Sequence, residues 1–119
     1  MAKIGAGAVD LDALKRALAT AIVDSFPMDT IRQYSLANIE RWNSQGVQST
    51  IYEEWKMILL AETNEELRAT ITVESDRSVR LRQSPPFIGL LPLTQSKAIK
   101  EAFGQKVDSP LNYKKSVTD

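Results

Sequence analysis

The sequence predicts a small, mainly α-helical protein, folded as a compact bundle of roughly four to five short helices. Apolar residues recur at spacings of three and four along much of the chain, as on the buried face of a helix. Residues that cap helices precede several of these runs. The chain has 119 residues, of which 43% are hydrophobic and 25% charged, which is typical of one globular domain with one core.

Three candidate helices occupy the N-terminal half. The first has its apolar residues on one helical face: Leu11, Leu14, Leu18, Ile22 and Phe26. Pro27 is expected to end this helix. Asp29 is a candidate cap for the second helix, and Gly46 is a candidate terminator. In the third, Thr50 and Glu53 have the spacing of a capping box. Trp42 and Trp55, on the second and third helices, are expected to anchor the core.

The region after residue 62 has two possible structures. Thr63 and Glu66 form another candidate capping box, which predicts a fourth helix. However, residues 70–73 are all β-branched, and residues 79–82 alternate between apolar and charged side chains. Residues 74–78 would form the turn between the two strands. A small β-hairpin near residues 70–82 is therefore the alternative to a helix.

The segment from Pro85 to Leu93 is apolar but interrupted by prolines and a glycine, so neither a helix nor a strand is expected there. Phe87, Ile88, Leu90 and Leu91 either dock in the core of the protein or form an exposed apolar patch that binds a partner.

A final helix is expected to begin at Thr94, to end at Gly104 and to have its buried face formed by Ala98, Ile99, Ala102 and Phe103. We expect residues 10–104 to be one helical domain, with a flexible N-terminal lead over residues 1–9 and a flexible tail over residues 105–119.

The composition argues against several classes of chemistry. The chain contains no cysteine and no histidine, so thiolate, Ser-His-Asp and ordinary zinc chemistry have no side chains to use. Neither of the glycine-rich phosphate-binding motifs occurs, and adjacent glutamates on a helix would point in different directions. We therefore predict a protein that is not an enzyme and has no cofactor, metal or catalytic residue.

The sequence also contains no apolar run of the roughly 20 residues needed to span a bilayer, and its first residues lack the pattern of a secretory signal. These observations predict a cytoplasmic protein with no membrane partner.

Charge is distributed unevenly along the chain. Residues 53–76 contain seven acidic and two basic side chains, whereas residues 77–119 contain eight basic and three acidic ones. Arg77, Arg80 and Arg82 form the densest basic cluster, and arginine binds carboxylate and phosphate oxygens well. The charges either neutralise each other within one molecule or bind an acidic partner.

These features favour a non-catalytic protein-interaction or regulatory module that binds another protein or a second copy of itself, as a homodimer for example. The predicted partner-binding residues are Phe87, Ile88, Leu90, Leu91, Arg77, Arg80 and Arg82. The alternative is a nucleic-acid-associated regulatory factor that uses the basic C-terminal half of the chain. Nothing in the sequence identifies a pathway.

Overall fold

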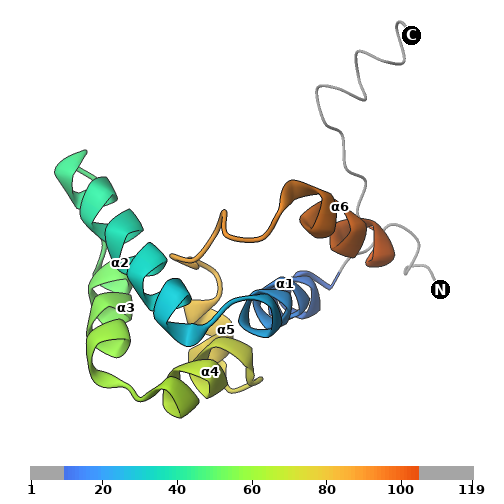
Figure 1. Ribbon diagram of the computed structural model, residues 1–119, viewed down its shortest axis with the longest axis horizontal. Coiled ribbons are helices and arrows are strands. Elements are labelled where there is room, and N and C mark those ends of the chain that lie inside the picture. The colour runs from blue at the N-terminus through green and yellow to red at the C-terminus, as the bar shows by residue number, and fades with distance from the viewer. Residues whose placement is uncertain (1–9, 105–119) are drawn as a thin grey trace, which may run out of the picture.

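The computed structural model describes residues 10–104, which form six helices, with a long connection over residues 82–92 before the last of them (Figure 1). They are α1 (Leu11–Ser25), α2 (Met28–Ser44), α3 (Thr50–Ala61), α4 (Asn64–Thr72), α5 (Asp76–Leu81) and α6 (Leu93–Ala102). No strand occurs within residues 10–104. The mainly α fold is therefore confirmed, with one helix more than the sequence predicted. The predicted lead and tail, residues 1–9 and 105–119, lie outside the described residues.

Helix α1 is the central element, because α2, α4 and α6 all pack against it. It begins at Asp10, whose side chain accepts a hydrogen bond from the backbone N–H of Ala13 at 3.1 Å. Its buried residues lie at helical spacings and join side chains from α2 to α5 in one core. The largest fully buried apolar side chains of that core are Trp55, Ile31, Ile39, Leu59, Leu67, Ile71 and Leu81.

The predicted hairpin near residues 70–82 is wrong, because this region contains the end of α4 and all of α5. The capping box of Thr63 and Glu66 is present in both directions and begins α4. Leu67, Thr70 and Ile71 are then buried on one helical face. Burial of this face outweighs the intrinsic strand preference of β-branched residues, which is weak and depends on context.

The helix ends follow the predictions only in part. Gly46 has φ +88° just after α2, so it terminates that helix as predicted. The cap of α3 is Ser49 rather than Thr50, and its hydroxyl accepts a hydrogen bond from Ile51 N–H at 3.3 Å. Helices α2 and α6 follow Pro27 and Pro92 and have no side-chain cap, so the predicted caps at 29 and 94 are wrong.

Trp55 holds three parts of the molecule together. Its side chain is fully buried, and its Nε1–H donates a hydrogen bond of 3.0 Å to the carbonyl oxygen of Leu81 at the end of α5. Its ring also contacts Phe87 edge to face, with the ring centres 5.7 Å apart. Trp42 is only partly buried and packs on Tyr52, with the ring centres 4.9 Å apart. Trp55 is therefore a core anchor as predicted, and Trp42 lies at the edge of the core.

Helix α6 is packed more lightly than the others, since none of its residues is buried. Of its predicted buried face, Ile99 and Phe103 are partly buried, whereas Ala98 and Ala102 are exposed. That predicted face is therefore wrong in part. In Figure 1, α6 lies beside α1 and away from the pair α2 and α3.

We predict that Trp55→Phe lowers the free energy of unfolding by roughly 2–4 kcal/mol, because it removes the buried hydrogen bond from the indole N–H to the Leu81 carbonyl and opens a void. Chemical denaturation followed by circular dichroism measures this loss. The same substitution at Trp42 is the matched control, and it should cost about 1 kcal/mol or less. Equal losses at the two positions would contradict the role assigned to Trp55.

Candidate functional site

The segment between α5 and α6 is fastened to the core by its apolar side chains and by its backbone. Phe87 is 2% exposed and Leu91 is 8% exposed. The carbonyl oxygen of Pro86 accepts a hydrogen bond of 2.9 Å from the buried side-chain amide of Asn38 on α2. Two of the predicted contact residues, Phe87 and Leu91, are thus supports of the segment and offer little surface to a partner.

The same segment also presents an apolar side chain to the outside. Ile88, next to buried Phe87, is 56% exposed, and Leu90 is partly buried. Leu93, at the start of α6, is 74% exposed. Both alternatives from the sequence are therefore present in one segment: Phe87 and Leu91 dock in the core, and Ile88 is exposed. Of the apolar side chains predicted to contact a partner, Ile88 is the one that is well exposed.

An apolar groove runs between α1 and this segment. It consists of two adjoining cavities of about 190 and 240 Å³, and Leu18, Ile22 and Ile88 line both. We call this surface the α1 groove. Its other lining residues are Lys15, Ala19, Arg82, Pro85, Phe87, Gly89, Leu91, Leu93, Ser96 and Lys100. The groove is therefore built from α1, the Pro85–Leu93 segment and α6.

Within residues 10–104, every charged side chain that lines the α1 groove is basic. Lys15 lies beside one cavity and Lys100 beside the other, and no ion pair involves either of them within residues 10–104. The Lys15 ammonium donates a hydrogen bond of 2.8 Å to the side chain of Gln83. The groove thus combines an apolar floor with positive charge, which suits an apolar ligand that carries negative charge.

Two of the predicted anion-binding arginines are engaged in ion pairs within the chain. Arg80 donates two hydrogen bonds of 2.9 Å to the carboxylate of Glu54, and these lower the pKa of that carboxyl. Arg77 pairs with Glu62 at 3.2 Å. Neither arginine lines the α1 groove. Their charge is neutralised locally, as in the alternative of mutual neutralisation that the sequence left open.

The third arginine, Arg82, is buried and closes the end of α4. It is 2% exposed, and its Nη1 donates to the carbonyl oxygens of Ile71 and Val73 at 3.0 and 2.6 Å. Arg16 adds a hydrogen bond of 2.6 Å from Nε to the carbonyl of Thr72. These carbonyls have no helical partner and lie at the negative end of the helix dipole. Burial lowers the pKa of Arg82, although an arginine remains protonated at neutral pH.

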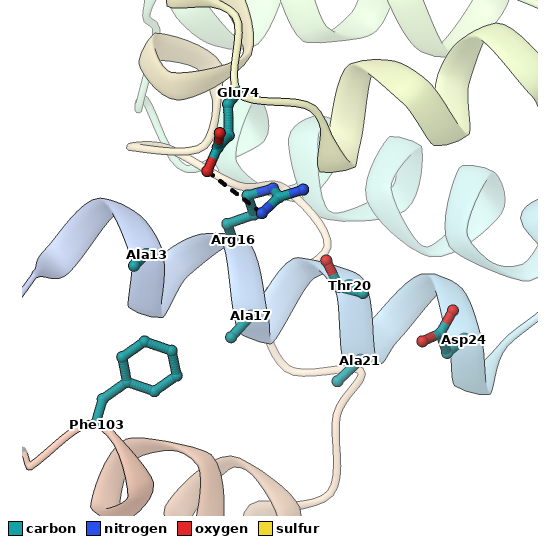
Figure 2. A pocket seen from close by; sticks show the side chains of 8 residues that line it. All are labelled: Ala13, Arg16, Ala17, Thr20, Ala21, Asp24, Glu74 and Phe103. Carbon is teal, nitrogen blue, oxygen red and sulfur yellow. Dashed lines mark hydrogen bonds and ion pairs between the residues drawn. The ribbon is translucent and has the colours of Figure 1, made fainter.

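A further cavity, of about 450 Å³, lies on the other side of α1 (Figure 2). Ala13, Ala17 and Ala21 line it from α1, and Phe103 points toward them from the end of α6. Its remaining lining residues are Arg16, Thr20, Asp24 and Glu74. Arg16 and Glu74 pair with each other at 3.4 Å, and Asp24 pairs with Arg68 at 3.9 Å, so all three charged lining residues are in ion pairs. Alanine side chains leave this space open because they are too short to meet α6.

No group of three or more acidic side chains among the described residues is placed to hold a metal ion. None of the described helices is both long and apolar enough to cross a membrane. Comparison with known proteins finds no protein family, curated protein or solved structure that matches the chain.

Several residues of the α1 groove were not predicted as site residues. Leu18 and Ile22 follow the helical pattern of a core face, and nothing in the sequence distinguishes them from Leu14, which belongs to the same predicted face and does not line the groove. Lys15 and Lys100 are 85 positions apart in the sequence, and only the packing of α6 on α1 brings them to one groove.

We predict that Gly89→Ala destabilises the protein by roughly 2–3 kcal/mol and disturbs the segment that carries Ile88. Gly89 has φ +101°, and an added Cβ would lie 2.5 Å from the hydroxyl of Tyr34. Gly46→Ala, with φ +88° and no atom within 4 Å of the added Cβ, should show only the smaller conformational cost. Combining Gly89→Ala with Tyr34→Phe should recover part of the loss in thermal unfolding. No recovery would show that the contact with Tyr34 is unimportant.

We also predict that Arg82→Ala lowers the free energy of unfolding by roughly 2–4 kcal/mol, because two carbonyls at the end of α4 lose their donor. Arg80→Ala is the control, since it removes an exposed ion pair and should have a much smaller effect. Urea denaturation of both variants measures the difference. A loss for Arg80→Ala as large as that for Arg82→Ala would contradict the assigned roles.

Proposed function

We propose that this protein is a non-catalytic protein-interaction module, and that its α1 groove binds an apolar segment of a partner protein that carries acidic side chains. The observation that carries the proposal is the exposure of Ile88 on a fastened segment, beside a groove whose charged lining residues are all basic.

The way the Pro85–Leu93 segment is built supports this function. A binding surface is most effective when its backbone is held in place before the partner arrives, because less conformational entropy is then lost. Phe87, Leu91 and the bond from Asn38 to the Pro86 carbonyl hold this backbone, and Ile88 projects from it. An exposed isoleucine next to an apolar groove is costly for a protein that binds nothing there, and such patches commonly mark partner surfaces.

Charge supports a partner with acidic side chains. Lys15 and Lys100 flank the apolar floor, and no acidic side chain from the described part of the chain lines it. Opposite charges around an apolar contact speed association and select among partners. An amphipathic helix with apolar residues on one face and acidic residues at its edges matches this pattern, since a groove of this kind receives side chains one helical turn apart.

We propose a non-catalytic role for the groove because of the side chains that line it. Its polar lining residues are two lysines, one serine and the buried Arg82, whose Nη1 binds two backbone carbonyls. The chain has no histidine or cysteine to act as a base or a thiolate. Ser96 is not hydrogen-bonded to a base, because its hydroxyl donates to the backbone carbonyl of Leu93 at 3.0 Å.

The test uses a designed peptide of roughly 18 residues, or five helical turns, with leucine on one face and glutamate on the other. We expect the full-length protein to bind it with a Kd of roughly 1–100 µM and to bind it more weakly as salt rises. Isothermal titration calorimetry and NMR chemical shifts measure the affinity and the residues affected. A version with lysine in place of glutamate should bind at least about tenfold more weakly.

Two substitutions at equally exposed positions locate the site. Ile88→Glu should weaken peptide binding at least about tenfold, since it places a charge in the apolar contact. Leu11→Glu changes a residue of α1 that is 52% exposed and lies outside the groove, so it should leave the affinity unchanged. Equal binding by the wild type and Ile88→Glu, or equal binding of the acidic and basic peptides, would overturn the proposal.

A further inference from the structure

A second exposed apolar surface lies on α3. Met57 is 69% exposed and Leu60 is 66% exposed, and they are three positions apart, so they lie on the same face of the helix. The opposite face of α3 holds Trp55, Ile58 and Leu59 in the core. We call the exposed face, with Met57 and Leu60 at its centre, the α3 ridge.

The α3 ridge has the features proposed for the ligand of the α1 groove. It presents two long apolar side chains one turn apart on a rigid helix. Exposed Glu53 lies one turn before Met57, and exposed Glu65 and Glu66 begin the next helix. Of the five acidic side chains in residues 49–66, Glu54 and Glu62 pair with arginines, and the other three face a single basic side chain in this range, Lys56. This part of the chain is thus apolar and acidic, whereas the α1 groove is apolar and basic.

The ridge and the groove occupy different sides of one molecule, so they cannot meet within it. Figure 1 shows α3 beside α2, and α6 beside α1 at the other side of the view. A helix contact between α3 and α6 is not among the main contacts of the described residues. A ridge can therefore enter a groove only on another copy of the chain.

From these observations we infer that copies of this chain associate head to tail, with the α3 ridge of one copy in the α1 groove of the next. The inference rests on the proposed function, because it uses the same groove and names a second copy as its occupant. Such a contact joins two different surfaces, so a pair of copies retains one free groove on one copy and one free ridge on the other. Repetition of the contact closes into a ring or extends into a filament, depending on the rotation between copies.

The test is the mass of the full-length protein in solution, measured by sedimentation equilibrium over a range of concentrations. The wild type should form dimers and larger species as concentration rises, and high salt should shift them toward the monomer. Ile88→Glu places a charge in the apolar groove and should make it unable to bind. Met57→Glu with Leu60→Glu places two charges on the ridge and should make the ridge unable to bind. Each should raise the dissociation constant at least about tenfold, whereas Leu11→Glu should not change it.

Mixing the two defective variants identifies the geometry of the contact. The ridge of the Ile88→Glu variant and the groove of the Met57→Glu, Leu60→Glu variant are both intact, so an equal mixture should form a one-to-one dimer with the wild-type dissociation constant. It should form nothing larger, because the remaining ridge and groove are both defective. Denaturation curves of the separate variants confirm that they are folded.

Other outcomes overturn the inference. A wild-type protein that remains monomeric, a dimer unaffected by these substitutions, or a mixture that stays monomeric would each contradict a head-to-tail contact. Peptide binding distinguishes this failure from a failure of the proposed function. The Met57→Glu, Leu60→Glu variant should still bind the leucine–glutamate peptide, and a monomeric protein that binds this peptide would retain the proposed function while losing the inference.

Discussion

The fully buried indole of Trp55 is the contact on which the rest of the arrangement depends. Its apolar body fills the core on the inner side of α3, and its single N–H group needs an acceptor once water is excluded. The carbonyl oxygen of Leu81 meets that need and thereby fixes where α5 ends. Phe87 packs against the same ring, so the segment after α5 takes its position from Trp55 as well.

The end of α4 imposes a second constraint, because its backbone carbonyls need hydrogen-bond donors, and two arginines supply them. The last carbonyl groups of α4, and the one that follows the helix, have no partners within the helix and need donors from elsewhere. Arg16 on α1 and Arg82 at the end of α5 supply the donors. Arginine suits this task because it stays charged and offers several N–H groups in a fixed plane. A basic residue near an apolar groove can therefore be a structural element of the fold.

The α1 groove exists because α6 covers α1 incompletely. Helix α6 has no buried residue and packs chiefly on α1, so it covers part of the apolar surface of α1 and leaves the rest open on both sides. The two sides differ in chemistry. The side shown in Figure 2 is floored by alanines and has its charges paired, whereas the groove beside Ile88 is more apolar and lined by unpaired lysines. This difference is why the groove, rather than the larger cavity, carries the proposed function.

The sequence by itself determined the helical fold, because the spacing of apolar residues and the local chemistry of caps act within a few residues of one another. The capping box of Thr63 and Glu66 and the termination of α2 at Gly46 are of this kind. The tertiary structure decided the rest. Residues 70–73 form helix because α4 buries Thr70 and Ile71, and burial exceeds their local preference for strand. Likewise, Phe87 is covered and Ile88 is exposed because of contacts with distant Trp55 and Asn38, and no local pattern contains that information.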